Sequence, residues 1–199
     1  DTIYRKSDDL FKEIFGGVGT LSRDLKKENP DIEIKCENFN VTEHGGELLR
    51  NIFVHIIRNS MDHGIESAEE RISAGKKPAG KICLTLDRVD SHAVIRYKDD
   101  GRGINISRLR DIAGKMGFLK EEEMKDPYKV VNIIFHEGVS TSKSVTEISG
   151  RGVGMGAIKE YVEKDGGRIE LKLLDLPKER QSFVPFEIEL SMPVAILVA

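Results

Sequence analysis

Apolar residues recur along this chain at two spacings, which predict helices in some segments and strands in others. A helical spacing, with every third or fourth residue apolar, is found in residues 7–15, 19–28 and 43–63. Apolar and polar residues alternate, as in half-buried strands, in residues 32–36, 81–88 and 92–98. The long helix should end at Gly64, because glycine commonly terminates helices.

The C-terminal part of the chain continues both patterns. A capping box at residues 67–70 should start a short helix that ends near Gly75. Further helices are expected at residues 107–117, with Ser107 as the cap, and at residues 126–135 and 154–164. Strands are expected at residues 168–174 and 183–192, and a loop rich in Gly, Ser and Thr at residues 136–151. Strands flanked by long helices without regular βαβ alternation predict an α+β fold, a two-layer α/β sandwich with helices on one face.

Composition is typical of a soluble globular domain. The 199 residues are 39% hydrophobic and 33% charged, and the net charge of −3 gives no reason to expect nucleic acid as a partner. Cys36 and Cys83 lack the spacing of metal ligands and are expected as small buried side chains. No apolar run is long enough to span a membrane, so no membrane contact is expected from this domain. The chain begins without an initiator Met and ends in an apolar, strand-like run at residues 192–199, so we expect a piece of a longer cytoplasmic protein.

A cluster of polar side chains lies on one face of the predicted long helix. His55, Asn59 and Asp62 are four and three residues apart, which places an imidazole, an amide and a carboxylate on the same side. Apolar residues such as Ile56 and Met61 can fill the other face. A helix with one apolar face and three such groups on the other indicates a binding site.

A second cluster, Asp99-Asp100-Gly101-Arg102-Gly103, directly follows a predicted strand. Taken alone, it is most simply an Asp-Gly turn. In a binding site, the glycines would let a planar ring approach the backbone, and an ionised Asp99 could only accept hydrogen bonds. The carboxylate would therefore favour adenine, whose exocyclic amine donates, over guanine, which presents a carbonyl group.

A third cluster, residues 150–156, is rich in glycine and opens a predicted helix. Backbone N–H groups that glycine leaves uncovered at a helix start can bind phosphate. A flexible hinge and a dinucleotide-binding fingerprint are the alternatives, but the fingerprint needs a buried strand before its first glycine, and the residues before Gly150 are polar. In the preceding loop, Ser140 and Thr141 either reach phosphate oxygens or are simply solvated.

The order of these clusters resembles the GHKL superfamily of ATPases, which have the Bergerat fold and a mixed sheet. The superfamily includes DNA gyrase B, MutL-type proteins, heat-shock chaperone ATPases and histidine kinases. A helix with HxxxN, then DxGxG after a strand, a Ser/Thr loop and GxGxG at a helix start follow one another as in that superfamily. Residues 55–66, 69–76 and 149–155 are similar to the catalytic domain of chemotaxis-type histidine kinases, and the likeness covers roughly residues 15–192.

The resemblance implies an ATP-dependent protein-histidine kinase. Asn59 would coordinate the Mg²⁺ that bridges the phosphates of ATP, and His55 would be the catalytic group. The adenine amine would bind to Asp99. The remaining nucleotide contacts would come from Asp62, His63, Gly101, Gly103, Ser140, Thr141, Gly150, Gly152, Gly154 and Met155.

The resemblance also implies partners and domain bounds. The phosphate would pass to a histidine on a separate phosphotransfer domain, in the same or another chain, and then to the receiver domain of a response regulator. A coupling protein and dimerisation of the full-length protein are further expectations. The domain would span residues 17–193, between a linker or the end of a helical dimerisation region at 1–16 and the start of a regulatory domain at 194–199.

Two alternatives stay open, an ATP hydrolase of the gyrase or MutL type and a degenerate nucleotide-binding scaffold. Hydrolases of the gyrase type carry Glu at the position of His55, so the imidazole favours a kinase. The scaffold is suggested by departures from the family pattern, such as Gly156 in place of Asp and Glu137 and Val139 in place of Pro and Phe in the lid. The Gly-Thr pair usual before the last strand is also missing. None of these departures touches Asn59 or Asp99, so ATP binding should survive.

Overall fold

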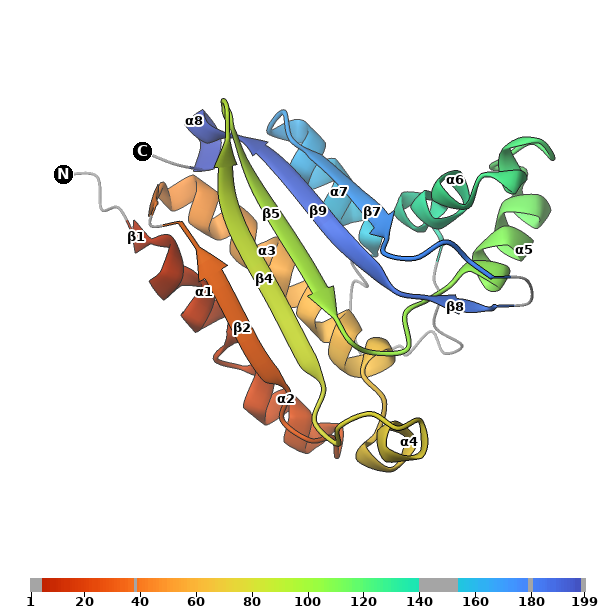
Figure 1. Ribbon diagram of the computed structural model, residues 1–199. Helices are drawn as coiled ribbons and strands as arrows, with labels where there is room; N and C mark the ends of the chain where they lie inside the picture. The colour runs from red at the N-terminus through yellow and green to blue at the C-terminus, as the bar shows by residue number, and fades with distance from the viewer. Residues whose placement is uncertain (1–4, 38, 140–153, 179–180, 198–199) are drawn as a thin grey trace.

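In the computed structural model, residues 5–37, 39–139, 154–178 and 181–197 are described, and they form a sheet layer and a helix layer (Figure 1). The sheet has five strands in the order β2-β4-β5-β9-β7, which span Asp31–Cys36, Lys81–Val89, His92–Asp99, Phe186–Pro193 and Arg168–Leu173. Strand β2 runs parallel to β4, and all other neighbours are antiparallel. The sheet is therefore mixed, and the expected α+β sandwich is confirmed.

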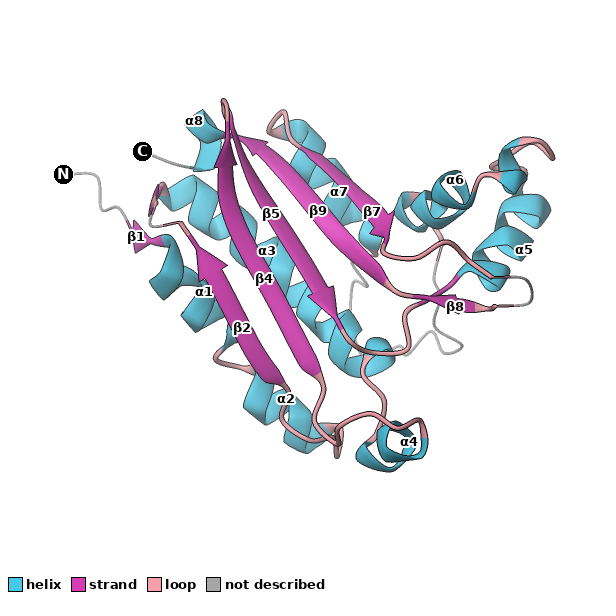
Figure 2. Ribbon diagram, in the orientation of Figure 1, coloured by secondary structure: helices cyan, strands magenta, loops and turns pink. Residues whose placement is uncertain are grey.

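Helices cover one face of this sheet, as Figure 2 shows. They are α1 (Ser7–Phe15), α2 (Val18–Asp24), α3 (Glu43–Asn59) and α7 (Met155–Lys164). Leu49, Ile52 and Phe53 on α3 share one core with Ile82 and Leu84 at alternate positions of β4. The helical spacing on α3 and the alternation on β4 each place apolar side chains on one face, and these two faces form the contact between the layers. Burying each such side chain contributes about 1.5–3 kcal/mol.

The helix that carries the first cluster changes its type near its end. Thr42 caps its start, where the hydroxyl oxygen accepts the N–H of Gly45 at 2.9 Å. After Asn59 the chain continues as a π-helical turn, η1 (Ser60–Gly64). Lys27 Nζ donates to the carbonyl oxygen of Ile65 at 2.7 Å just beyond this turn. The predicted end at Gly64 is confirmed, but a uniform helical face through Asp62 is wrong, because a π turn is wider than an α turn.

Two predicted helix starts have different outcomes. Helix α4 (Ala68–Ser73) begins with the expected capping box of Ser67 and Glu70. Helix α5 (Ile106–Met116) is capped by Asn105, whose Oδ1 accepts the N–H of Arg108 at 3.0 Å, so the prediction of Ser107 as the cap is wrong. The pairing of β6 (Ile104–Asn105) with β8 (Phe183–Val184) holds Asn105 in extended backbone before the helix.

The remaining elements follow α5. The short helix η2 (Glu123–Lys125) leads to α6 (Pro127–Asn132), which Asp126 caps as predicted, and then to η3 (Ile133–Phe135). The strand expected at residues 183–192 is divided into β8 and β9 at Pro185. Proline causes this break because it has no N–H for the sheet ladder.

Both ends of the described chain pack against the domain. Strand β1 (Arg5–Lys6) pairs with β3 (Asn40–Val41), and α1 buries Leu10 and Phe11 completely. Residues 5–16, predicted as part of a linker or of the end of a helical dimerisation region, therefore contribute to the core of this domain. The expectation of a strand-like run at residues 192–199 is wrong for residues 194–197, because they form helix α8 (Val194–Leu197). Thr42 Oγ1 donates to the carbonyl oxygen of Ile196 at 2.7 Å, which fixes α8 at the start of α3.

The two cysteines are less buried than expected. Cys36 and Cys83 are free and only half-buried, so the expectation of buried side chains is wrong. Both lie on strands near the edge of the sheet, where one side of a strand has less cover.

Among the described residues, no helix is both long and apolar enough to cross a bilayer.

Candidate functional site

The carboxylate of Asp99 lies at the end of β5 and is held on both of its oxygens. Ser60 Oγ donates to Oδ2 at 2.6 Å, and the backbone N–H of Gly101 donates to Oδ1 at 2.9 Å. The hydroxyl of the buried Tyr97 donates in turn to Ser60 Oγ at 2.9 Å. Strand β5 supplies Tyr97 and Asp99, and η1 supplies Ser60, so the strand end and the π turn together set the direction of the carboxylate.

The surroundings of Asp99 suit a ligand that donates hydrogen bonds. Burial is the main influence and raises the pKa of Asp99 above its ordinary value, while the hydrogen bonds from Ser60 and Gly101 act in the opposite direction and favour the ionised form. An ionised carboxylate has about four acceptor sites, and two of them are used by Ser60 and Gly101. A Cβ atom added at Gly64 would lie 3.2 Å from Asp99 Oδ2, so glycine leaves this side of the carboxylate uncovered. An exocyclic amine fits these residues.

The glycines after Asp99 are required by the packing of the backbone. A Cβ atom at Gly101 would lie 2.3 Å from the carbonyl oxygen of Gly64. Gly103 has a φ of 87°, and a Cβ atom there would lie 2.4 Å from the carbonyl oxygen of Val184. Their proposed place beside a nucleotide ring stays a prediction, because the fold needs glycine at both positions for a separate reason.

The first and third clusters meet at the end of α3. Asn59 is exposed there, and its Nδ2 donates to Met155 Sδ of α7 at 3.7 Å. Gly154 caps α7 without a side chain, and a Cβ atom at Gly154 would have no neighbour within 4 Å among the described atoms. An amide and an uncovered helix start, 96 residues apart in the sequence, are thus brought together. Such a helix start can bind an anionic group.

The other residues of the first cluster differ in exposure and pairing. His55 lies one turn before Asn59 and is half-buried. Burial, and to a smaller extent the charge of Arg58, lower the pKa of its imidazole, which favours the neutral form. Asp62 is paired with Arg58 at 3.4 Å, and His63 is exposed. The neutral imidazole can accept a proton beside Asn59.

Several predicted site residues lie outside the described part of the chain, namely Ser140, Thr141, Gly150 and Gly152. Among the described residues there is no group of three or more His, Cys, Asp or Glu side chains that could enclose a metal ion. The amide oxygen of Asn59 is nevertheless a suitable ligand for Mg²⁺, which commonly takes most of its ligands from phosphate groups and water. The donor set therefore fits a magnesium ion that arrives with a nucleotide.

The structure has a charged network beside Asp99 that the sequence did not predict. Arg71 on α4 is fully buried and pairs with Glu66 at 3.0 Å and with Asp100 at 2.8 Å. Ser60 was also missed, although its position directly after Asn59 is a usable signal. Arg71 has no such signal, because its burial depends on a partner 29 residues away.

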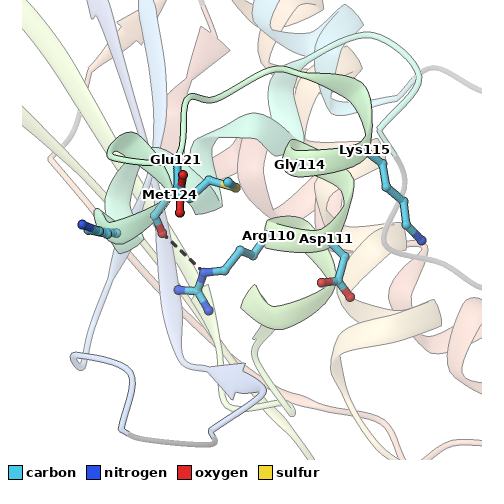
Figure 3. Close-up of a pocket in the computed structure, with 7 residues that line it drawn as sticks. Arg110, Asp111, Gly114, Lys115, Glu121 and Met124 are labelled. Carbon is cyan, nitrogen blue, oxygen red and sulfur yellow. Dashed lines mark hydrogen bonds between the residues drawn. The ribbon is translucent and has the colours of Figure 1, made fainter.

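A shallow hollow elsewhere on the molecule has a different lining (Figure 3). It lies along α5 and the segment that includes η2, and its residues are Arg110, Asp111, Gly114, Lys115, Glu121, Met124 and Lys125. In this region Arg110 Nε donates to the carbonyl oxygen of Met124 at 3.4 Å (Figure 3). None of these residues belongs to the three clusters, so the hollow is separate from the candidate site.

Comparisons with known proteins match most of the chain. Residues 45–193 match the family described as histidine kinase-, DNA gyrase B- and HSP90-like ATPases. The chain is 36% identical over 163 residues to the chemotaxis protein CheA of Rhizobium meliloti and 40% identical over 163 residues to that of Cereibacter sphaeroides. Each match covers 80% of this chain but only 22% and 24% of those relatives. The chain thus spans about a quarter of their length.

Solved structures are similar in fold. A mycobacterial sensor histidine kinase, MprB, has a TM-score of 0.55 at 14% identity, with 97% of both chains covered. The catalytic domain of the histidine kinase ThkA has a TM-score of 0.54 at 14% identity, with 97% of this chain and 96% of that chain covered. At these identities the likeness concerns the arrangement of helices and strands.

Proposed function

This chain belongs to the family of histidine kinase-, DNA gyrase B- and HSP90-like ATPases, and we propose that it is the ATP-binding catalytic domain of a chemotaxis-type histidine kinase. The domain would bind Mg·ATP and transfer the γ-phosphate to a histidine on a separate phosphotransfer domain. A receiver domain would act downstream, and the site of action would be the bacterial cytoplasm. The observation that carries the proposal is the Asp99 carboxylate, which Ser60 and Gly101 direct and which Gly64 leaves uncovered.

The residues of the site have separate tasks in this reaction. Asp99 accepts a hydrogen bond from the adenine amine, and Asn59 supplies an oxygen ligand for Mg²⁺, which would neutralise phosphate charge. The start of α7, which Gly154 caps without a side chain, would face the phosphate groups, because the first N–H groups of a helix have no partner within the helix. Phosphoryl transfer depends mainly on positioning and charge neutralisation, so these contacts should matter more than any base.

His55 would handle the proton in the transfer step. The bond between the γ-phosphorus and the oxygen that bridges it to the β-phosphate breaks, ADP leaves, and a nitrogen–phosphorus bond forms on the acceptor histidine. The acceptor imidazole releases a ring proton when it is phosphorylated, and His55 is available in its neutral form to accept that proton, because burial and Arg58 lower its pKa. A carboxylate would instead suit the activation of water, as in the hydrolase alternative.

Binding selectivity tests the proposal most directly. Mg·ATP and Mg·GTP are titrated into the protein in a calorimeter, and we expect ATP to bind at least about tenfold more tightly, equivalent to 1.4 kcal/mol. The physical reason is that guanine presents a carbonyl group to an acceptor-only carboxylate. Equal affinity for the two nucleotides would contradict the proposal.

Phosphate transfer tests the assignment of His55 and Asn59. With a cognate phosphotransfer domain and labelled ATP, we expect His55→Gln and Asn59→Asp to abolish transfer to the acceptor histidine. Transfer at the wild-type rate in either variant would show that the assigned role is wrong. Steady release of phosphate to water, without an acceptor domain, would instead favour the hydrolase.

A further inference from the structure

The peptide unit between Asp100 and Gly101 lies between two cations and the carboxylate of Asp99. Its carbonyl oxygen accepts hydrogen bonds from Lys76 Nζ at 3.0 Å and from Arg71 Nη1 at 3.3 Å. Its N–H donates to Asp99 Oδ1 at 2.9 Å. Hydrogen bonds at the two ends of one amide polarise it in the same sense, so the two cations strengthen the hydrogen bond that the amide donates to Asp99.

Carboxylates hold both cations in place. The buried Arg71 pairs with Glu66 at 3.0 Å and with the side chain of Asp100 at 2.8 Å. Lys76 pairs with the other oxygen of Glu66 at 2.7 Å and also donates to the carbonyl oxygen of Gly101 at 3.1 Å. Bonds to charged groups are short and directional, so this network fixes the tilt of the peptide unit.

We propose that Arg71 and Lys76 are positioning residues for the nucleotide, which orient the Asp99 carboxylate through the peptide unit between Asp100 and Gly101. They thereby set the preference for a purine that carries a 6-amino group. The inference rests on the proposed function, because it requires Asp99 to accept a hydrogen bond from that amine. Both cations donate to the carbonyl oxygen of Asp100, and the N–H of the same peptide unit donates to Asp99, so one amide links the two cations to the carboxylate.

A nucleotide without the amine isolates this effect. Purine riboside triphosphate has the phosphates and the ring system of ATP but lacks the 6-amino group. The affinities of its Mg²⁺ complex and of Mg·ATP are measured by calorimetry for the wild type and for Lys76→Met. We expect the ratio of the two affinities to fall about threefold to tenfold in the variant, the size expected for one weakened hydrogen bond. The affinity for the analogue should change little.

The choice of variants separates positioning from folding. Arg71→Met would leave Glu66 and Asp100 without a buried partner and threatens folding, so Lys76, whose side chain is 33% exposed, is the primary position. Arg102→Met is the matched control, because Arg102 is a cation in the loop directly after Asp99, and its side chain pairs with Glu70 at 3.4 Å. We expect Arg102→Met to leave the ratio unchanged.

The outcomes distinguish the two proposals. If the wild type binds both nucleotides equally, the contact between Asp99 and the amine does not exist, and the proposed base recognition fails. If the wild type prefers ATP and Lys76→Met keeps the full ratio, only the positioning role is overturned. An equal loss of affinity for both nucleotides would also overturn it, because a purely structural role moves both affinities together.

Discussion

At the Asp99 end of the candidate site, buried and charged side chains hold one another in place, whereas the Asn59 end is exposed and loosely connected. The Asp99 carboxylate receives two hydrogen bonds, and fully buried Arg71 braces the loop that follows it. Asn59 makes a weak contact of 3.7 Å with Met155, and within the described part of the chain no atom lies within 4 Å of a Cβ added at Gly154, the start of α7.

This difference indicates how the two ends recognise different parts of a nucleotide. A flat base offers a few directional hydrogen-bonding groups, so its partner must be oriented before binding. Phosphate groups carry charge and bring a metal ion with its own water and oxygen ligands. We therefore expect substitutions near Asp99 to affect stability and base selectivity, and substitutions near Asn59 to affect ligand binding alone.

Arg71→Met should have the largest effect on stability. It leaves the carboxylates of Glu66 and Asp100 without the buried guanidinium, and breaking such a pair costs about 3–5 kcal/mol. Urea unfolding measures the change in free energy. Arg102→Met, which removes an exposed pair with Glu70, should cost less than about 1 kcal/mol. Similar losses in both variants would remove the distinction between a buried brace and a surface pair.

A pair of glycine substitutions compares the two ends directly. In Gly101→Ala, the new Cβ atom would lie 2.3 Å from the carbonyl oxygen of Gly64, so we expect a loss of about 2 kcal/mol or more in unfolding free energy. In Gly154→Ala the new atom meets no atom of the described residues within 4 Å, and the change should stay within about 0.5 kcal/mol. Equal changes in urea unfolding would contradict the difference in packing.

Asp99→Asn should weaken ATP binding by about 10- to 100-fold, the range expected for losing a hydrogen bond to a charged group. The amide places an NH₂ donor where one of the accepting oxygens was, and the adenine amine is also a donor. Calorimetric titration of Mg·ATP measures the loss. Binding that stays intact would show that the base lies elsewhere.

Asn59→Ala should act on the metal-dependent part of binding. The side chain is exposed, so the unfolding free energy should change by less than about 0.5 kcal/mol. Affinity for Mg·ATP should fall at least about tenfold, since mutating even the partners of metal ligands has that effect. With excess EDTA, the variant and the wild type should bind ATP alike. A loss of equal size with and without metal would mean that Asn59 contacts the nucleotide itself.

The smallest expected effect is a change in the pKa of the His55 imidazole, near the exposed end of the site. Burial and the charge of Arg58 lower the pKa of His55 below its ordinary value of 6.5. NMR titration of the free protein should show this, and Arg58→Met should raise the pKa. Arg50→Met, which removes a cation paired with Glu13, should leave it unchanged. Because the pKa is depressed on folding, the unfolded chain takes up this proton more readily, so stability is fully present above the unfolded pKa and is lost as the pH falls from there through the lower folded pKa.

Much of the fold could be predicted because its signals are local. The spacing of Leu49, Ile52 and Phe53 places them on one side of α3 whatever the rest of the chain does. The capping box at Ser67 needs only residues three positions apart. Asp99 could be selected as a candidate because a carboxylate and glycines follow an alternating strand, although its contact with a ligand stays a prediction.

The errors occur where a distant segment decides the local structure. Asn105, rather than Ser107, caps α5 because β6 pairs with a strand almost 80 residues away. Residues 194–197 form a helix against Thr42 instead of a strand, since Thr42 bonds to the carbonyl oxygens of Ile196 and Leu197. The π turn after Asn59 cannot be distinguished from an α turn by residue spacing alone.

The sequence by itself determined the positions of most helices and strands, the membership of the chain in its family, and the candidates Asn59 and Asp99. These depend on the types and spacing of residues close together in the chain. Only the tertiary structure decided that Arg71 is buried against Asp100 and that Asn59 meets Met155, contacts that span 29 and 96 residues. The physical reason is that the orientation of a carboxylate and the burial of a cation depend on which distant groups the packed core brings beside them.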